Sequence, residues 1–168
     1  MNGDGCPAEE FRRESERLKR RVIHAPRLGG QRWRQVALLY RLADSYGRRV
    51  FPRSLCHEKV SAFSGCVTGE CCRCRPDVFA SEKELLDRLP KPPDNAGYCL
   101  FFNIAKKTCG IYGVRPFACR IYYNMVASRL YCQNPADATL QLFDTLKRHV
   151  EKILGPHLGG YTHGPEAG

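Results

Sequence analysis

Ten cysteines in a chain of 168 residues constrain the fold more than any other feature of this sequence. Eight of them form two groups: Cys66, Cys71, Cys72 and Cys74, within CVTGECCRC, and Cys99, Cys109, Cys119 and Cys132, at wider spacings. No helical or strand periodicity is visible between Phe51 and Asp77. The order of that segment must therefore come from something other than apolar burial. Sulfur ligation of a metal is the interpretation that this pattern favours.

The expected compartment decides between metal ligation and disulfide bonding. The first twenty residues lack the apolar core of a secretory signal. No run of the sequence approaches the roughly 18 apolar residues of a membrane span. We therefore expect a cytoplasmic protein with no membrane segment, whose thiols stay reduced. In such proteins a cysteine cluster more often holds metal or does redox chemistry than it forms disulfides.

The spacing of the first group limits the kinds of centre it can build. Cys71 and Cys74 form a C-x-x-C pair, which lets two sulfur atoms close on one ion at about 2.3 Å each. Cys72 points in a different direction from Cys71 and would reach a second metal or a larger cluster. A zinc ribbon has two such pairs and a bacterial ferredoxin has a C-x2-C-x2-C-x3-C-P run, neither of which is present here. Spacing alone leaves open iron or zinc, the number of sites, and the roles of Cys6, Cys56 and His57.

The stretch CGIYGVRPFACR, residues 109–120, places cationic and aromatic residues between two cysteines. Four thiolates around a divalent ion leave a net charge of about −2, which is costly to bury unless cations or amide donors face it. Pro116 biases Arg115 away from helical conformation. We therefore predict that Tyr112, Arg115 and Arg120 surround the centre and support it. The alternatives are a surface ion pair for Arg115 and ordinary core packing for Tyr112.

Helical periodicity predicts two helices before the cysteine segment and one after it. Apolar residues recur at helical steps over residues 8–23 and 32–46, which predicts a basic helical hairpin within residues 1–50. Asn134-Pro135 and Gly155-Pro156 predict the start and end of a C-terminal helix over residues 134–155. Residues 156–168 are predicted to form a flexible tail.

Shorter elements are predicted inside the cysteine-rich core, residues 51–133. Ser81 and Glu84 predict a capping box that opens a short helix, which Pro90 ends. The run YCLFFNIAKKTCGIY, residues 98–112, predicts a β-hairpin around a Lys-Lys turn. The expected fold is therefore a single, mainly α domain with a small cysteine-rich metal-binding segment, irregular or hairpin-like.

Positive charge is concentrated near the N-terminus. The chain has 27 Lys+Arg against 17 Asp+Glu, and residues 1–55 hold 13 of the former and 6 of the latter. A solvated helix face is the favoured interpretation, ahead of nucleic-acid binding. The alternative function is a zinc-stabilised module whose basic helices bind nucleic acid or a protein partner.

The cysteine pattern resembles that of the zinc- or iron-chelating CxxCxxCC proteins, the YkgJ-like family. The second half of the match is dense and consists of Cys99, Phe101, Phe102, Cys109, Tyr112, Arg115, Pro116, Cys119 and Arg120. The first half is FSGCVTGECCR, in which Gly65 and Thr68 stand where the family has its first two cysteines. The resemblance covers residues 63–132, less than half of the chain.

The resemblance implies a set of ligands and a cofactor. It carries over securely to Cys71, Cys72, Cys99, Cys109 and Cys119, and less directly to Cys66, Cys74 and Cys132. It implies an iron–sulfur cluster or zinc, and the similar pattern in flagellin lysine N-methylases favours iron. The sequence has no Gly-rich strand–turn–helix motif for binding S-adenosylmethionine. We therefore do not expect methyl transfer by this chain alone, and a role accessory to a protein-modifying, methylase-like activity is a further alternative. No Ser-His-Asp order, phosphate loop or paired carboxylates mark an enzyme, and catalysis stays an open alternative.

Overall fold

The computed structural model describes residues 7–25, 32–53, 60–61, 65–66, 77–91, 98–122 and 137–161. Within these ranges the protein is mainly helical, as the sequence predicts. The helices are α1 (Pro7–Ile23), α2 (Arg32–Val50), α3 (Ala80–Asp87), α4 (Phe117–Ile121) and α6 (Asp137–Leu154), with 3-10 turns η1 (Phe51–Arg53) and η4 (Tyr112–Val114). The strands are β1 (Val60–Ser61), β2 (Gly65–Cys66), β3 (Asp77–Phe79), β4 (Phe102–Asn103), β5 (Thr108–Cys109) and β6 (His157–Gly160).

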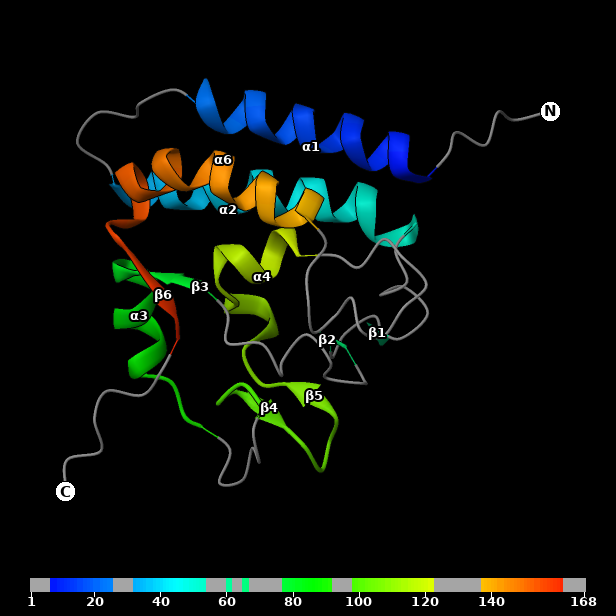
Figure 1. Ribbon diagram of the computed structural model, residues 1–168. Coiled ribbons are helices and arrows are strands. Elements are labelled where there is room, and N and C mark those ends of the chain that lie inside the picture. The colour runs from blue at the N-terminus through cyan, green and yellow to red at the C-terminus, as the bar shows by residue number, and fades with distance from the viewer. Residues whose placement is uncertain are drawn as a thin grey trace.

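The two N-terminal helices form where the periodicity predicts them. α1 packs against both α2 and α6, and α4 packs beneath them against α2 (Figure 1). α2 runs past its predicted end at residue 46, through Gly47, to Val50. A glycine inside a helix costs about 1 kcal/mol, which the burial of Tyr46 and Val50 on either side outweighs.

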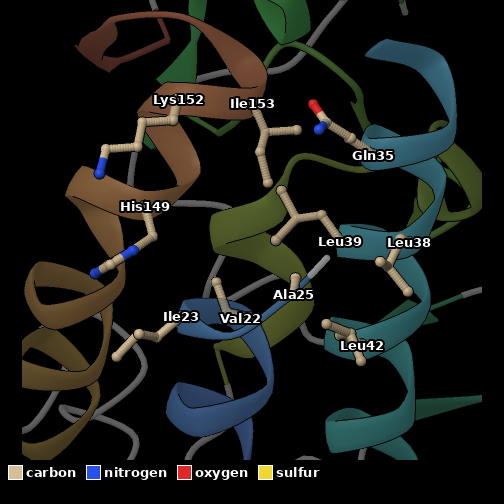
Figure 2. A pocket seen from close by; sticks show the side chains of 10 residues that line it. All are labelled: Val22, Ile23, Ala25, Gln35, Leu38, Leu39, Leu42, His149, Lys152 and Ile153. Atoms are coloured by element: carbon tan, nitrogen blue, oxygen red, sulfur yellow. The ribbon is translucent and has the colours of Figure 1, made fainter. Parts of the chain in front are cut away.

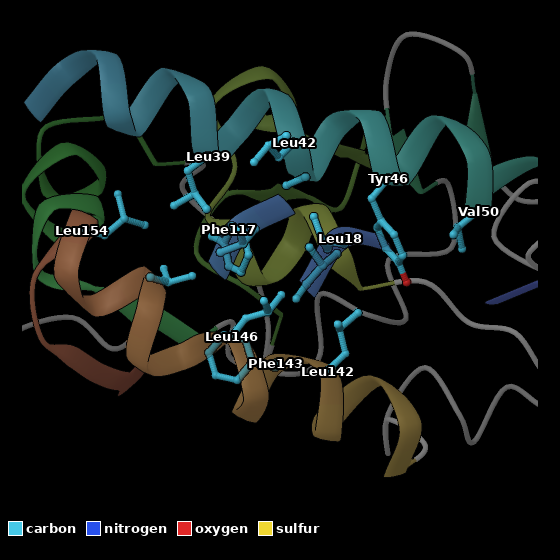
Figure 3. Packing of buried hydrophobic residues seen from close by; sticks show 14 of the residues in the cluster. Leu18, Leu39, Leu42, Tyr46, Val50, Phe117, Leu142, Phe143, Leu146 and Leu154 are labelled. Carbon is cyan, nitrogen blue, oxygen red and sulfur yellow. The ribbon is translucent and has the colours of Figure 1, made fainter. Parts of the chain in front are cut away.

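The larger hydrophobic core lies where α1, α2, α4 and α6 meet. Leu18, Leu39 and Leu146 come from the three long helices, and each is almost fully buried. Phe117 of the short helix α4 inserts among them with no exposed surface (Figure 3). This single aromatic side chain anchors α4, and with it Cys119, on the helical layer.

Strand β3 connects the large core to a smaller one. Successive side chains of a strand point to opposite faces. Phe79 accordingly packs in the large core, while Val78 packs in the small core with Leu86, Phe101 and Tyr161. The β4–β5 hairpin contributes Phe101 to this small core and lies at the opposite end of the molecule from α1 (Figure 1).

The flexible tail predicted for residues 156–168 is wrong for its first part. Residues 157–160 form β6, which pairs antiparallel with β3. Tyr161 is only 4% exposed, stacks on Phe101 at 5.6 Å between ring centroids, and donates a hydrogen bond to Asp87 at 2.9 Å. The run of small and polar residues concealed this strand, because its order comes from tertiary pairing. Residues 162–168 lie outside the described part.

The predicted end of the C-terminal helix is confirmed. α6 ends at Leu154, and Gly155 adopts a positive φ of 84° while its N–H bonds the carbonyl of Glu151 at 2.9 Å. A residue with a side chain is strained in this conformation, which makes glycine the usual residue just past a helix. The predicted cap at Asn134 lies outside the described residues.

The capping box predicted at the start of α3 is present, but it is formed by Glu82 and not by the predicted Glu84. Glu84 is exposed, whereas Glu82 is 3% exposed and bonds the N–H of Phe79 at 3.1 Å. The other oxygen of Glu82 accepts hydrogen bonds from the N–H of Phe117 and the hydroxyl of Tyr40, each at 2.7 Å. Ser81 instead accepts a hydrogen bond from Arg32. Glu82 thereby joins α2, α3 and α4.

We predict that Glu82→Ala lowers the free energy of unfolding by about 3 kcal/mol, because it leaves two buried N–H groups without an acceptor. Urea denaturation measures the change. Glu84→Ala is the matched control and should change the free energy of unfolding by less than about 0.5 kcal/mol. Equal effects of the two substitutions would contradict the role assigned to Glu82.

Glu82 also gives the stability a pH dependence of known sign. Burial raises its pKa above the ordinary value of 4.5, although hydrogen bonds from Phe117, Tyr40 and Phe79 oppose the shift. The folded state therefore holds this proton more tightly than the unfolded state does. Stability contributed by Glu82 is then present below pH 4.5 and is lost as pH rises through the raised pKa. Between about pH 4 and about pH 7, the free energy of unfolding of the wild type should fall relative to that of Glu82→Gln, which has no carboxyl group to ionise at this position. Urea denaturation at both pH values measures the difference.

Candidate metal centre

The β4–β5 hairpin positions two of the predicted ligands. Phe102 pairs with Cys109 across the hairpin, and the N–H of Phe102 bonds the carbonyl of Cys99 at 2.8 Å. Lys107 takes a positive φ of 51° in the turn, so the predicted Lys-Lys turn is confirmed. Cys99 and Cys109 are both half-buried and both pack against the small core. The hairpin thus holds two thiols from positions ten residues apart on one scaffold.

A strand from the first cysteine group lies beside this hairpin. β2, which ends at Cys66, pairs with β1 and lies against β5, which ends at Cys109. The chain therefore brings the backbone of Cys66, from the first group, to the backbone of Cys109, from the second. The two groups are 43 residues apart in sequence at these positions (109 − 66). This approach is a tertiary contact. In the sequence, the two groups of cysteines are the only signal that suggests it.

Cys119 lies on α4, next to the polar network of Glu82. It is half-buried and close to Tyr40 of α2. Burial and the Glu82 carboxylate raise the pKa of Tyr40, and nearby Cys119 adds to this, so the hydroxyl stays protonated and donates to Glu82. On the other side, Cys99 lies close to Tyr161, whose pKa is raised by burial and by Asp87. Each of these two thiols thus has a neutral tyrosine near it.

Arg120 holds the loop between Cys109 and Cys119 on the helical core. It is 6% exposed and forms an ion pair with Asp44 of α2, with both N···O distances at 2.8 Å. Its other N–H groups donate to the carbonyls of Arg115, at 2.9 Å, and Gly113, at 3.0 Å. Its guanidinium also lies over the ring of Tyr40, 4.3 Å from the centroid. These contacts make Arg120 a positioning residue for the second cysteine group.

Tyr112 and Arg115 contact each other directly. The guanidinium carbon of Arg115 lies 4.2 Å from the centroid of the Tyr112 ring, a cation–π contact. Arg115 has the extended conformation that Pro116 favours, with φ −57° and ψ 148°. Both side chains are half-buried. The pair keeps a cation within the loop that joins Cys109 to Cys119. Its predicted role in supporting a metal centre stays a prediction.

The remaining predicted ligands, Cys71, Cys72, Cys74 and Cys132, lie outside the described residues, as do Cys6, Cys56 and His57. For Cys66 only the backbone is described. In the described ranges no three His, Cys, Asp or Glu side chains gather closely enough to hold a metal ion. Cys99, Cys109 and Cys119, the cysteines whose side chains are described, are therefore not gathered into a metal site by themselves.

A pocket of about 430 Å³ lies away from the cysteines, between the end of α1, the start of α2 and the end of α6. Its walls are mostly apolar, with Val22, Leu39 and Ile153 among them, and its polar residues are Gln35, His149 and Lys152. Figure 2 shows the side chains of His149 and Lys152 extending away from Leu39. The pocket thus lacks converging polar groups that would mark a catalytic site.

Comparison with known proteins leaves the cysteine pattern as the guide to function. No family model matches the sequence, and neither a curated protein nor a solved structure is significantly similar to it. The resemblance to the CxxCxxCC proteins thus stays a prediction. Among the described helices, none combines the length and the apolar character needed to span a bilayer.

Sequence reasoning missed the residues that support Cys119 from other elements. Tyr40 and Asp44 are four residues apart on α2 and so share one helix face, where both contact Arg120. The sequence shows that Tyr40 and Asp44 share a helix face. It does not show that this face binds Arg120, because polar residues beside an apolar stripe also occur on helix faces exposed to solvent. Nothing local in the sequence pairs Glu82 with Phe117, because their contact spans 35 residues.

We predict that Arg120→Gln loosens the loop that carries Cys109 and Cys119. It removes a charged donor from Asp44 and from two carbonyls, and hydrogen bonds to charged groups contribute about 1.5–3 kcal/mol. We expect the free energy of unfolding to fall by about 2 kcal/mol and amide hydrogen exchange to accelerate over residues 110–121. Arg88→Gln, at an exposed arginine, should leave exchange in this loop unchanged. Unaltered exchange in Arg120→Gln would refute the positioning role.

Proposed function

We propose that this protein is a cytoplasmic metal-binding protein whose two cysteine groups together hold iron, as an iron–sulfur cluster, in preference to zinc. The proposed ligands come from Cys66, Cys71, Cys72 and Cys74 in the first group and Cys99, Cys109, Cys119 and Cys132 in the second. Tyr112, Arg115 and Arg120 support the segment that carries the second group. The role is structural, in electron transfer, or in metal handling.

The observation that carries this proposal is the contact of β2 with β5. It brings Cys66 of the first group and Cys109 of the second to adjacent strands. A centre shared by the two groups would account for this contact between segments that are 43 residues apart in sequence. The half-buried state of Cys99, Cys109 and Cys119 also suits ligands, which need access to a centre and shielding from water.

The available donors fit an iron–sulfur cluster or zinc by their chemistry. Thiolates are soft ligands that select zinc, copper(I) and iron–sulfur clusters over hard cations. The single C-x-x-C pair and the adjacent Cys71 and Cys72 suit a cluster with separated iron atoms better than one small ion. When bound, such a cluster supplies one-electron transfer at a potential set by its surroundings.

The described residues prepare the site in two ways. The small core and the hairpin hold Cys99 and Cys109, while Phe117 and Arg120 fix α4 and therefore Cys119. The cations Arg115 and Arg120 lie within four residues of Cys119, and positive charge favours the thiolate form that binds metal. These residues preorganise the thiols of the second group before any ligand set is completed.

Anaerobic purification followed by metal and acid-labile sulfide analysis tests the proposal. We expect brown protein with broad visible absorption, and iron and sulfide in matching amounts. Cys109→Ser should remove most of the iron and sulfide, because it deletes a ligand at the junction of the two groups. Cys6→Ser, which alters a cysteine outside both groups, is the matched control and should keep the wild-type content.

Two results would refute the proposal in different ways. Colourless protein with bound zinc and no sulfide would exclude the iron–sulfur assignment and leave thiolate ligation in place. Protein without any tightly bound metal, or full metal content in Cys109→Ser, would overturn the assignment of this centre.

A further inference from the structure

The described acidic side chains of α1 and α2 are already bound by internal partners. Glu14 is buried and contacts both Arg49, by a hydrogen-bonded ion pair, and Arg17, at 3.6 Å. Glu16 pairs with Lys19 at 2.7 Å, and Asp44 pairs with Arg120. These carboxylates neutralise cations between and within the helices. None of these carboxylates forms an ion pair with Arg34, Arg41 or Arg48, three exposed arginines of α2.

Arginines form a straight row on the exposed face of α2. Arg34, Arg41 and Arg48 follow one another at intervals of seven residues, which is close to two helical turns, so they share one face. All three are exposed, and no described acidic side chain forms an ion pair with any of them. The row extends about 21 Å along the helix, at 1.5 Å per residue.

A second row lies on α1, which packs against α2. Arg13, Arg17 and Arg20 are spaced by four and three residues, and all are exposed on the side of α1 away from Leu18. Residues 17–43, which span the end of α1 and most of α2, contain eight Lys+Arg and no Asp or Glu. The two rows and the sequence between them therefore carry an excess of positive charge.

An exposed aromatic ring lies at the start of the α2 row. Trp33 is 66% exposed, and the guanidinium carbon of Arg34 lies 5.2 Å from its ring centroid. A single exposed apolar side chain is common on protein surfaces, so Trp33 bears on function only together with the cations beside it. Aromatic rings next to cations are the platforms on which single-stranded nucleic acids stack their bases.

We propose that the outer face of α1 and α2 binds single-stranded nucleic acid, with Arg34, Arg41 and Arg48 contacting phosphates and Trp33 stacking on a base. A row of three arginines over about 21 Å can follow the phosphate backbone of one extended strand. In Figure 1, α1 lies farthest from the β4–β5 hairpin, and α2 lies between α1 and α4. None of Arg34, Arg41, Arg48 and Trp33 is among the proposed metal ligands.

A lipid surface fits this face less well. Helices that lie in a membrane interface insert a broad apolar face beneath their cations. The apolar faces of α1 and α2 are instead buried in the large core. On the described parts of these helices, the exposed large apolar side chains are Ile23 and Trp33, which cannot form such a face.

Fluorescence anisotropy with a labelled 20-nucleotide uridine RNA tests the proposal on the full-length protein as purified. We expect binding whose affinity falls steeply between about 50 mM and about 200 mM KCl, with a slope of about 0.7 per phosphate contact. The row variant R34Q/R41Q/R48Q should reduce that slope by about 2 and weaken binding at least tenfold. Trp33→Ala should weaken binding about fivefold or more, with the salt slope unchanged.

The control variant R88Q/K106Q/K107N removes the same charge from exposed positions outside the two rows. It should retain most of the affinity, and circular dichroism melting shows whether each variant is folded. The proposal is overturned by equal losses in both triple variants, by the absence of binding at 50 mM KCl, or by tighter binding to anionic vesicles or to a duplex of equal length. Iron is measured in the same samples. Because the iron content reports on the metal centre and the anisotropy reports on nucleic-acid binding, either proposal can fail without the other.

Discussion

The placement of helix α4, and therefore of Cys119, depends on the hydrogen bonds of the buried Glu82 carboxylate. Its oxygens accept hydrogen bonds from Phe79, Phe117 and Tyr40, which belong to β3, α4 and α2. A buried carboxylate is costly unless several donors satisfy it, so this geometry is tightly specified. With Glu82 in place, α4 begins at Phe117, and Cys119 has a fixed position on the helical layer.

Arg120 and Phe117 complete this attachment by different forces. Phe117 buries its ring among four helices, and Arg120 joins Asp44 to the carbonyls of the loop before α4. The loop can therefore stay irregular without losing its order, because side chains satisfy its backbone groups. Below it, the small core holds Cys99 and Cys109. Cys119 is thus held by the large core, and Cys99 and Cys109 by the small core. Strand β3 joins the two cores, and a shared metal centre would add a second link between them.

Charge separates the two proposed activities in space. Carboxylates within the helical layer are bound by internal partners, and none of those described pairs with Arg34, Arg41 or Arg48 on the exposed side of α2. Cys109 lies on strand β5 of the hairpin, which Figure 1 places at the opposite end of the molecule from α1. A thiolate centre is anionic, so distance from a polyanion surface avoids repulsion between the two. One chain can therefore carry both sites without conflict.

The sequence by itself determined the long helices, the hairpin and the grouping of cysteines, because each depends on local signals: apolar periodicity, a Gly-Pro helix end and the Lys-Lys turn. It also placed Arg115 in extended conformation through Pro116. Only the tertiary structure decided that Glu82 caps α3, that Arg120 pairs with Asp44, that residues 157–160 form a strand, and that β2 lies beside β5. Apart from the cap itself, these contacts join residues that are 43 positions (Cys66 and Cys109), 76 positions (Asp44 and Arg120) and 83 positions (Asp77 and Gly160) apart. Their energy comes from burial and pairing that exist only once the chain is folded, so no local pattern could reveal them.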